Sequence, residues 1–182
     1  MNRFKRAHLV ALIAVLSGSL TAVPALVAQA GTPPSVEWVL TGMAAQSYAI
    51  VGIGDGGHAL SLTRVAPVTV GPNEFGAAAA ILNAEPYRGR RVRLHAFIRS
   101  DSVSVGGSTW LRIDGASGSL MLENNVSRML SGTTGWSEQV TTLEVPASAT
   151  RIIYGLLLSG GGTVHAKDVT IENVAPPAQG AP

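Results

Sequence analysis

Residues 91–98 alternate between side chains of two kinds, and this alternation constrains the fold more than any other feature of the chain. A period of two is typical of a β-strand with one face in a core and the other toward water or a ligand. The apolar set comprises Val92, Leu94, Ala96 and Ile98, and the opposite set comprises Arg91, Arg93, His95 and Phe97. The segment is therefore predicted to be a half-buried strand.

Nine further short runs have the composition of strands: residues 37–40, 47–53, 58–65, 75–82, 109–114, 119–123, 136–145, 151–158 and 163–172. Turn-rich pieces separate them, among them residues 54–57, 106–107, 115–118 and 159–162. The run from Ala77 to Ala80 has an intrinsic preference for helix, but its short, glycine-flanked setting favours a strand. Many short strands at even spacing predict an all-β fold, an antiparallel sandwich of two sheets.

The N-terminus has the layout of a secretory signal peptide. Basic residues at Arg3, Lys5 and Arg6 precede an apolar stretch over 9–27, and Ala28-Gln29-Ala30 is a small-residue cleavage site. We therefore expect residues 1–30 to be removed and the mature chain to begin at Gly31. An uncleaved membrane anchor is the alternative, because the apolar stretch approaches the length of about 20 residues that spans a bilayer.

Removal of the leader changes the charge of the chain. The leader takes 3 of the 13 basic groups, which leaves 10 against 11 acidic groups, so the formal charge goes from +2 to −1. The basic excess thus gives no support for a nucleic-acid partner. There are no cysteines, which excludes disulfides and thiolate sites.

The mature chain is predicted to hold one domain. We expect a lead-in over 31–35, a β-sandwich over 36–174 and a disordered tail over 175–182, which contains three prolines. No membrane span is expected after leader removal, and the protein is expected in the periplasm or outside the cell.

Several motifs suggest chemistry that their context does not support. Gly52-x-Gly54-x-x-Gly57 fits a dinucleotide fingerprint, but a strand rather than a helix is expected to follow it. Ser159, His165 and Asp168 contain the residue types of a hydrolase triad, yet residues three apart on a strand point to opposite faces.

Two surface features have a structural and a functional interpretation. The basic cluster Arg88, Arg90, Arg91 and Arg93 could bind a polyanion or form the wet face of a strand. Asn125-Val126-Ser127 is a formal N-glycosylation sequon.

Trp110, Arg112 and Asp114 are expected to share one face of a strand, with Leu111 and Ile113 on the other. An indole beside a guanidinium and a carboxylate suits a sugar, whose C–H face stacks on the ring while the charged groups bind hydroxyls. The same trio equally suits a buried tryptophan over an internal Arg–Asp pair.

A series of motifs resembles, in order, a bacterial galactose-binding-like jelly-roll module. The series is YRGRRVRL (87–94), WLRIDG (110–115), LEN (122–124), GTTGW (132–136), VP (145–146), YGLLLSG (154–160) and residues 164–169. Trp38, Tyr48 and Phe75-Gly76 match the weaker N-terminal half. The resemblance implies a jelly-roll β-sandwich similar to carbohydrate-binding modules, which occur as accessory domains.

Two sites are expected, and the second of them is implied by the resemblance. A glycan is expected over Trp110, Arg112 and Asp114, with Glu123, Asn124 and His165 at the rim. Asp168 and Glu37 are candidates for a structural calcium, and no other cofactor is expected.

The chain departs from the family pattern in two places. HAKDV at 165–169 stands where the family has an aromatic residue and two aspartates, and LENN stands at 122–125 in place of Phe-Asp-Asn-Met. Lys167 would repel a cation from the candidate calcium site.

The sequence thus predicts an exported, non-catalytic module that binds glycan or envelope polysaccharide. The alternatives are a protein-interaction or structural envelope module without a sugar ligand and, third, a hydrolase.

Overall fold

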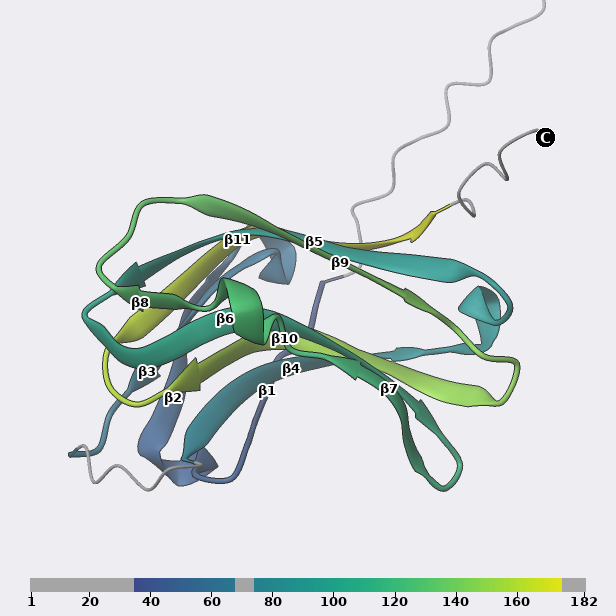
Figure 1. Ribbon diagram of the computed structural model, residues 1–182, viewed down its shortest axis with the longest axis horizontal. Coiled ribbons are helices and arrows are strands. Elements are labelled where there is room, and N and C mark those ends of the chain that lie inside the picture. The colour runs from purple at the N-terminus through teal and green to yellow at the C-terminus, as the bar shows by residue number, and fades with distance from the viewer. Residues whose placement is uncertain (1–34, 68–73, 175–182) are drawn as a thin grey trace, which may run out of the picture. The chain divides into compact units, whose positions relative to one another are not determined.

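The computed structural model describes residues 35–67 and 74–174, which form two antiparallel sheets packed face to face (Figure 1). Sheet A has the order β1-β4-β10-β6-β7, with β8 also paired to β6, and sheet B has the order β2-β3-β11-β5-β9. The predicted leader, most of the lead-in and the tail lie outside the described residues.

The strands of sheet A are β1 (Val39–Thr41), β4 (Phe75–Asn83), β6 (Val103–Gly115), β7 (Gly118–Glu123), β8 (Leu130–Gly132) and β10 (Ala149–Ser159). Those of sheet B are β2 (Tyr48–Gly54), β3 (Ala59–Arg64), β5 (Arg91–Asp101), β9 (Ser137–Glu144) and β11 (Thr163–Val174). Short 3₁₀ turns lie at Ala45–Ser47, Asp55–Gly57, Glu85–Tyr87 and Val126–Arg128. Within these ranges, no helix has the length and apolar character needed to cross a membrane.

The predicted all-β sandwich is confirmed, and so is the strand over Ala77–Ala80. These alanines lie in β4, which pairs with both β1 and β10. Pairing on two sides supplies hydrogen bonds that outweigh the intrinsic preference of alanine for helix.

The core lies between the sheets and is built from the predicted apolar faces. In β5, Val92, Leu94, Ala96 and Ile98 are fully buried, and in β6 Leu111 and Ile113 are buried opposite them. Other large core residues come from β3 and β10: Leu60, Leu62, Ile152, Leu156 and Leu158. The inward face of each strand therefore follows the period of two in the sequence.

Gly106-Gly107, expected as a turn, lies instead inside β6. A Cβ at Gly107 would overlap the side chain of Val164 from the opposite sheet, and one at Gly106 would lie 2.9 Å from the Met129 sulfur. The glycines thus permit a close approach within the sandwich, which is the other common use of this residue.

A buried polar network joins β6 to β9 beside the core. Asn125 donates from Nδ2 to the Thr109 hydroxyl at 2.8 Å and to the Thr141 hydroxyl at 2.7 Å. The Oε1 atom of Gln139 accepts from the Thr109 backbone at 2.8 Å and from its hydroxyl at 2.9 Å. Asn125 is only 6% exposed, so the side chain of the sequon asparagine is buried and makes hydrogen bonds within the folded protein.

Candidate functional site

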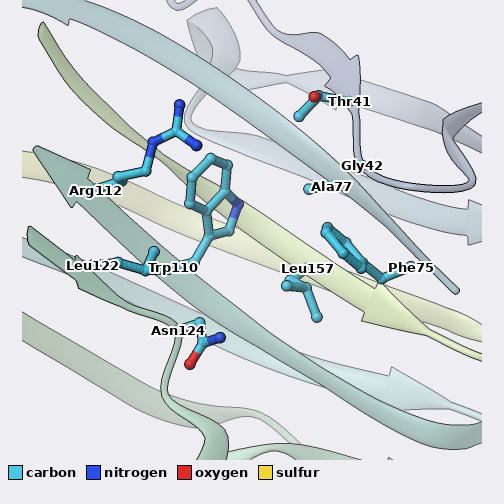
Figure 2. A pocket seen from close by; sticks show the side chains of 9 residues that line it. All are labelled: Thr41, Gly42, Phe75, Ala77, Trp110, Arg112, Leu122, Asn124 and Leu157. Carbon is cyan, nitrogen blue, oxygen red and sulfur yellow. The ribbon is translucent and has the colours of Figure 1, made fainter. Parts of the chain in front are cut away.

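The outer face of sheet A carries the predicted trio. Leu111 and Ile113 point into the core, so Trp110, Arg112 and Asp114 project from the opposite face of β6, as predicted. Across the sheet, Trp110 is in register with Gly155 of β10, which is in register with Ala79 of β4. These small neighbours leave room for the indole to lie across the sheet (Figure 2).

The Trp110 side chain packs against the sheet and also borders a cavity. Only 7% of the residue is exposed, and it clusters with Ala77, Ala79 and Ile153 outside the main core. Its Nε1–H is shared between the carbonyls of Leu156, at 3.1 Å, and Ala78, at 3.3 Å. The two interpretations of Trp110 therefore do not exclude each other: the indole is fixed by the sheet and still borders a cavity.

That cavity, here called the Trp110 pocket, has a volume of about 180 Å³. Most of its lining is apolar, and its polar side chains are a hydroxyl, a guanidinium and an amide, as Figure 2 shows. It is lined by Thr41, Gly42, Phe75, Ala77, Trp110, Arg112, Leu122, Asn124 and Leu157.

Arg112 is held by the buried carboxylate of Asp114. The Asp114 side chain is only 3% exposed, and its oxygens lie 2.9 Å from Arg112 Nε and 3.0 Å from Arg112 Nη2. Arg151 Nη2 binds the same carboxylate at 3.1 Å. Asp114 thus orients Arg112, whose side chain remains 36% exposed, and its own burial leaves little of the carboxylate to contact a sugar.

The three predicted rim residues lie in different places. Asn124 lines the Trp110 pocket. Glu123 is in register with the inward-facing Leu111, so it points away from the Trp110 face, and its Oε1 accepts from the Asn125 N–H at 2.8 Å. His165 is in β11 of sheet B, so it does not belong to this rim.

Several lining residues were not predicted from the sequence. Phe75 and Leu157 reach the pocket from β4 and β10, and Thr41 from β1. Arg151 reaches Asp114 because the two are in register between β10 and β6. Phe75 and Leu157 lie 35 and 47 positions from Trp110 in the chain, and Arg151 lies 37 positions from Asp114, so the order of strands brings them together.

The calcium candidates do not form a cation site in this part of the chain. Glu37 borders a pocket together with Val169 and Thr170, the two residues that follow Asp168 in the sequence. Asp168 itself is exposed and has a φ of 52° in the irregular part of β11. No group of three or more potential metal ligands occurs within residues 35–67 and 74–174. Calcium takes about six to eight oxygen ligands, so the two acids alone do not fit it.

The excluded motifs are accounted for by the fold. The 3₁₀ turn after Gly54 leads into strand β3, not into a helix, as expected. The partners of the His165 ring are Ser61 Oγ, 2.8 Å from Nδ1, and Asp101 Oδ2, 2.8 Å from Nε2, rather than the Ser159 and Asp168 of the considered triad. Ser61 lies within β3 between β2 and β11, and Asp101 is also bound by Arg99, so this row lacks the exposed turn and free amides of a hydrolase nucleophile.

Comparison with known proteins identifies the fold of the domain. No protein-family model matches the chain. A solved structure described as a CBM4 superposes with a TM-score of 0.52 and 15% identity, covering 78% of this chain and 90% of that one. The domain has the jelly-roll fold of carbohydrate-binding modules.

Two further relatives resemble the module. The CBM22-1–GH10 modules of Clostridium thermocellum xylanase 10B, complexed with xylohexaose, match with a TM-score of 0.52 at 12% identity, over 76% of this chain and 26% of that one. The uncharacterised HTH-type transcriptional regulator YbfP of Bacillus subtilis is 35% identical over 102 residues, which are 56% of this chain. The match covers 35% of the regulator's length.

Proposed function

We propose that the protein is a non-catalytic module that binds a glycan on the outer face of sheet A. The observation that carries this proposal is the Trp110 pocket. In it, the fixed indole lies beside the amide of Asn124 and the guanidinium of Arg112, which is held by the buried carboxylate of Asp114. Apolar surface with a few positioned polar groups is the usual design of a small-molecule site. The shared fold with carbohydrate-binding modules is consistent with it.

The size of the pocket limits the ligand. A volume of about 180 Å³ is smaller than the roughly 300–1,000 Å³ of sites that enclose a drug-sized molecule. The pocket therefore suits one ring of a longer saccharide, with the remaining rings along the open face of the sheet. A chain-like glycan fits this arrangement better than a free monosaccharide.

Each side chain has a distinct role in this proposal. Phe75 and Leu157 share the apolar contact with the sugar ring, because little of Trp110 is exposed. Arg112 and Asn124 bind hydroxyl groups. Asp114 and Arg151 position Arg112 without touching the sugar.

A location outside the inner membrane is part of this proposal, because the N-terminus has the layout of a signal peptide. We propose that cleavage after Ala30 releases the module into the periplasm or the medium, where envelope and environmental polysaccharides occur.

A second candidate is a protein-interaction module that uses the same face. Val39, Ile81 and Leu122 are 43%, 51% and 56% exposed, and their register partners Ala79, Ile153 and Arg112 belong to the Trp110 face. Such an apolar border also suits contact with another polypeptide.

A glycan array probed with the purified chain tests the proposal. We expect saturable binding to one class of oligosaccharide and competition by the same sugar in solution. Asn124→Ala should weaken that binding, whereas Asn173→Ala, an exposed amide at the end of β11, should not. Absence of any glycan signal, with one protein partner recovered through the same face, would replace the proposal by the second candidate.

A further inference from the structure

Trp136 is exposed on the side of the module opposite to the Trp110 pocket. It is 46% exposed, against 9% for Trp38 and 7% for Trp110. Trp136 directly precedes β9 of sheet B. Tryptophan is enriched at interaction surfaces, where one end of the ring is apolar and the other can bind polar groups.

Two cations lie against the indole. Lys167 Nζ is 4.9 Å from the ring centroid and Arg99 Cζ is 5.5 Å from it. Lys167 Nζ is also 5.6 Å from the Phe97 ring. Phe97, Arg99 and Lys167 project outward from sheet B, because their neighbours Ala96, Ile98 and Ala166 are buried in the core. We call these four residues, Trp136, Phe97, Arg99 and Lys167, the Trp136 platform.

The two cations of the platform differ in how they are paired. Arg99 binds Asp101 through Nη1 at 2.8 Å, and Asp101 also binds His165 at 2.8 Å. Glu138, on the neighbouring strand, is 3.0 Å from His95. Lys167 has no salt bridge within the described part of the chain. Glu138 is also in register with Phe97, so Asp101 and Glu138 both lie near the two platform cations. Of these cations, Arg99 is salt-bridged, and the ammonium group of Lys167 remains available to an anion.

Hydrogen-bonding groups continue from the platform across the sheet. Ser61, His165 and Asp101 form a row linked by contacts of 2.8 Å from β3 to the end of β5. Thr63 and Thr163 form a second contact of 2.7 Å beside it. This region offers hydroxyl and imidazole partners next to an aromatic plate, a combination that suits a polyhydroxylated ligand.

We propose that the Trp136 platform is a second carbohydrate site, and that it binds a polysaccharide containing uronic acids. The C–H face of a uronate ring stacks on the exposed indole, while its carboxylate pairs with Lys167 and Arg99. A neutral glycan has no carboxylate to pair with Lys167, and a polyanion without sugar rings has no C–H face to stack on the indole. The site lies on sheet B and is independent of the proposed function of sheet A.

Affinity electrophoresis of the full chain in gels containing polygalacturonate tests this inference. Trp136→Ala should weaken binding roughly tenfold or more, as loss of a central aromatic does at other interfaces, and Lys167→Ala should weaken it severalfold. Arg93→Ala is the matched control, because Arg93 is an exposed cation of the same sheet that pairs with Glu172 outside the platform. It should retain nearly full binding.

The outcomes separate this site from its alternatives. Equal losses for Arg93→Ala and Lys167→Ala, or equal competition by single-stranded DNA, would show general attraction to polyanions and overturn the proposal. Retained binding by Trp136→Ala would also overturn it. Arg112→Ala should leave polygalacturonate binding intact, so failure of the sheet A proposal would be seen independently.

A fluorescence measurement tests the same site without relying on variants. Iodide should quench mainly Trp136, since the other two tryptophans are buried, and polygalacturonate should protect it. Unchanged quenching at saturating polygalacturonate would contradict stacking on the indole.

Discussion

Trp110 shows how one side chain can serve packing and binding together. Its indole N–H is bound to two strand carbonyls, its faces are almost fully covered, and its remaining surface borders the pocket. A platform residue that is fixed in this way loses little conformational entropy when a ligand binds.

Truncation of Trp110 should therefore reduce stability as well as binding. We expect Trp110→Ala to lower the free energy of unfolding by about 3–5 kcal/mol, the range for buried aromatic truncations. Denaturant unfolding measures this, with Trp136→Ala as a control that should change stability by less than about 1 kcal/mol, the usual strength of exposed cation–π contacts. Similar small losses for both variants would mean that Trp110 is not part of the packed structure.

The buried side chain of Asn125 leads to a second prediction. Asn125→Ala removes the hydrogen bonds to Thr109 and Thr141 and should destabilise the fold by about 1–3 kcal/mol, because buried partners are left unsatisfied. Ser127→Ala destroys the same sequon at an exposed position and should leave the melting temperature unchanged. Stable glycosylation of Asn125 in natively folded protein would contradict the buried network.

Ionisation of Tyr154 should make the stability of the folded module depend on pH in the alkaline range. Burial, aided by the charge of Tyr87, raises the pKa of Tyr154 from 10.0 to about 12. The unfolded state therefore loses this proton first, so stability is complete below pH 10 and falls as the pH rises toward 12, by at most about 2.7 kcal/mol. Chemical denaturation at pH 9 to 12 should show this decrease, and Tyr154→Phe should flatten it. An equally steep decrease in the variant would assign the effect to other groups.

At the scale of elements, β4 and β10 create the surface on which the site is built. Ala77 and Ala79 of β4 lie on the outer face and Ala78 and Ala80 on the inner face. Their small side chains, with Gly155 of β10, allow the Trp110 ring to lie close to the backbone. The alanine run is thus a packing requirement of the sandwich.

Gly155→Ala tests this arrangement. The added Cβ would overlap the Ala78 carbonyl and lie 2.9 Å from the Trp38 ring, so we expect a loss of about 1–3 kcal/mol in unfolding free energy, typical of overpacking. Gly54→Ala is the control, because nothing lies within 4 Å of the Cβ position there, and its stability should remain within about 0.5 kcal/mol of the original. A neutral Gly155→Ala would show that β4 and β10 can separate freely.

The local part of this architecture could be predicted from the sequence. The period of two identified the buried faces of β5 and β6, and therefore the shared face of Trp110, Arg112 and Asp114. The turn expected at Gly106-Gly107 was wrong, since glycine serves turns and close packing alike. A single sequence does not distinguish these two uses.

At the scale of the whole molecule, the order of strands decides which residues meet. His165 was expected beside Trp110 but lies in the other sheet, because the sequence does not specify to which sheet each strand belongs. The same non-local pairing brings Arg151 to Asp114 and Phe75 to the Trp110 pocket. The result is a sandwich with separate candidate surfaces on its two outer faces.

The two arginines on Asp114 allow the most direct measurement of glycan binding by sheet A. Both bind the same buried carboxylate, but only Arg112 lines the pocket. We would titrate Arg112→Ala and Arg151→Ala calorimetrically with the oligosaccharide identified on the array. The account predicts that Arg112→Ala loses roughly tenfold or more in affinity, as for a charged hydrogen bond to the ligand, while Arg151→Ala stays within about threefold of the original. Equal affinities for the two variants and the original protein would contradict binding at the Trp110 pocket.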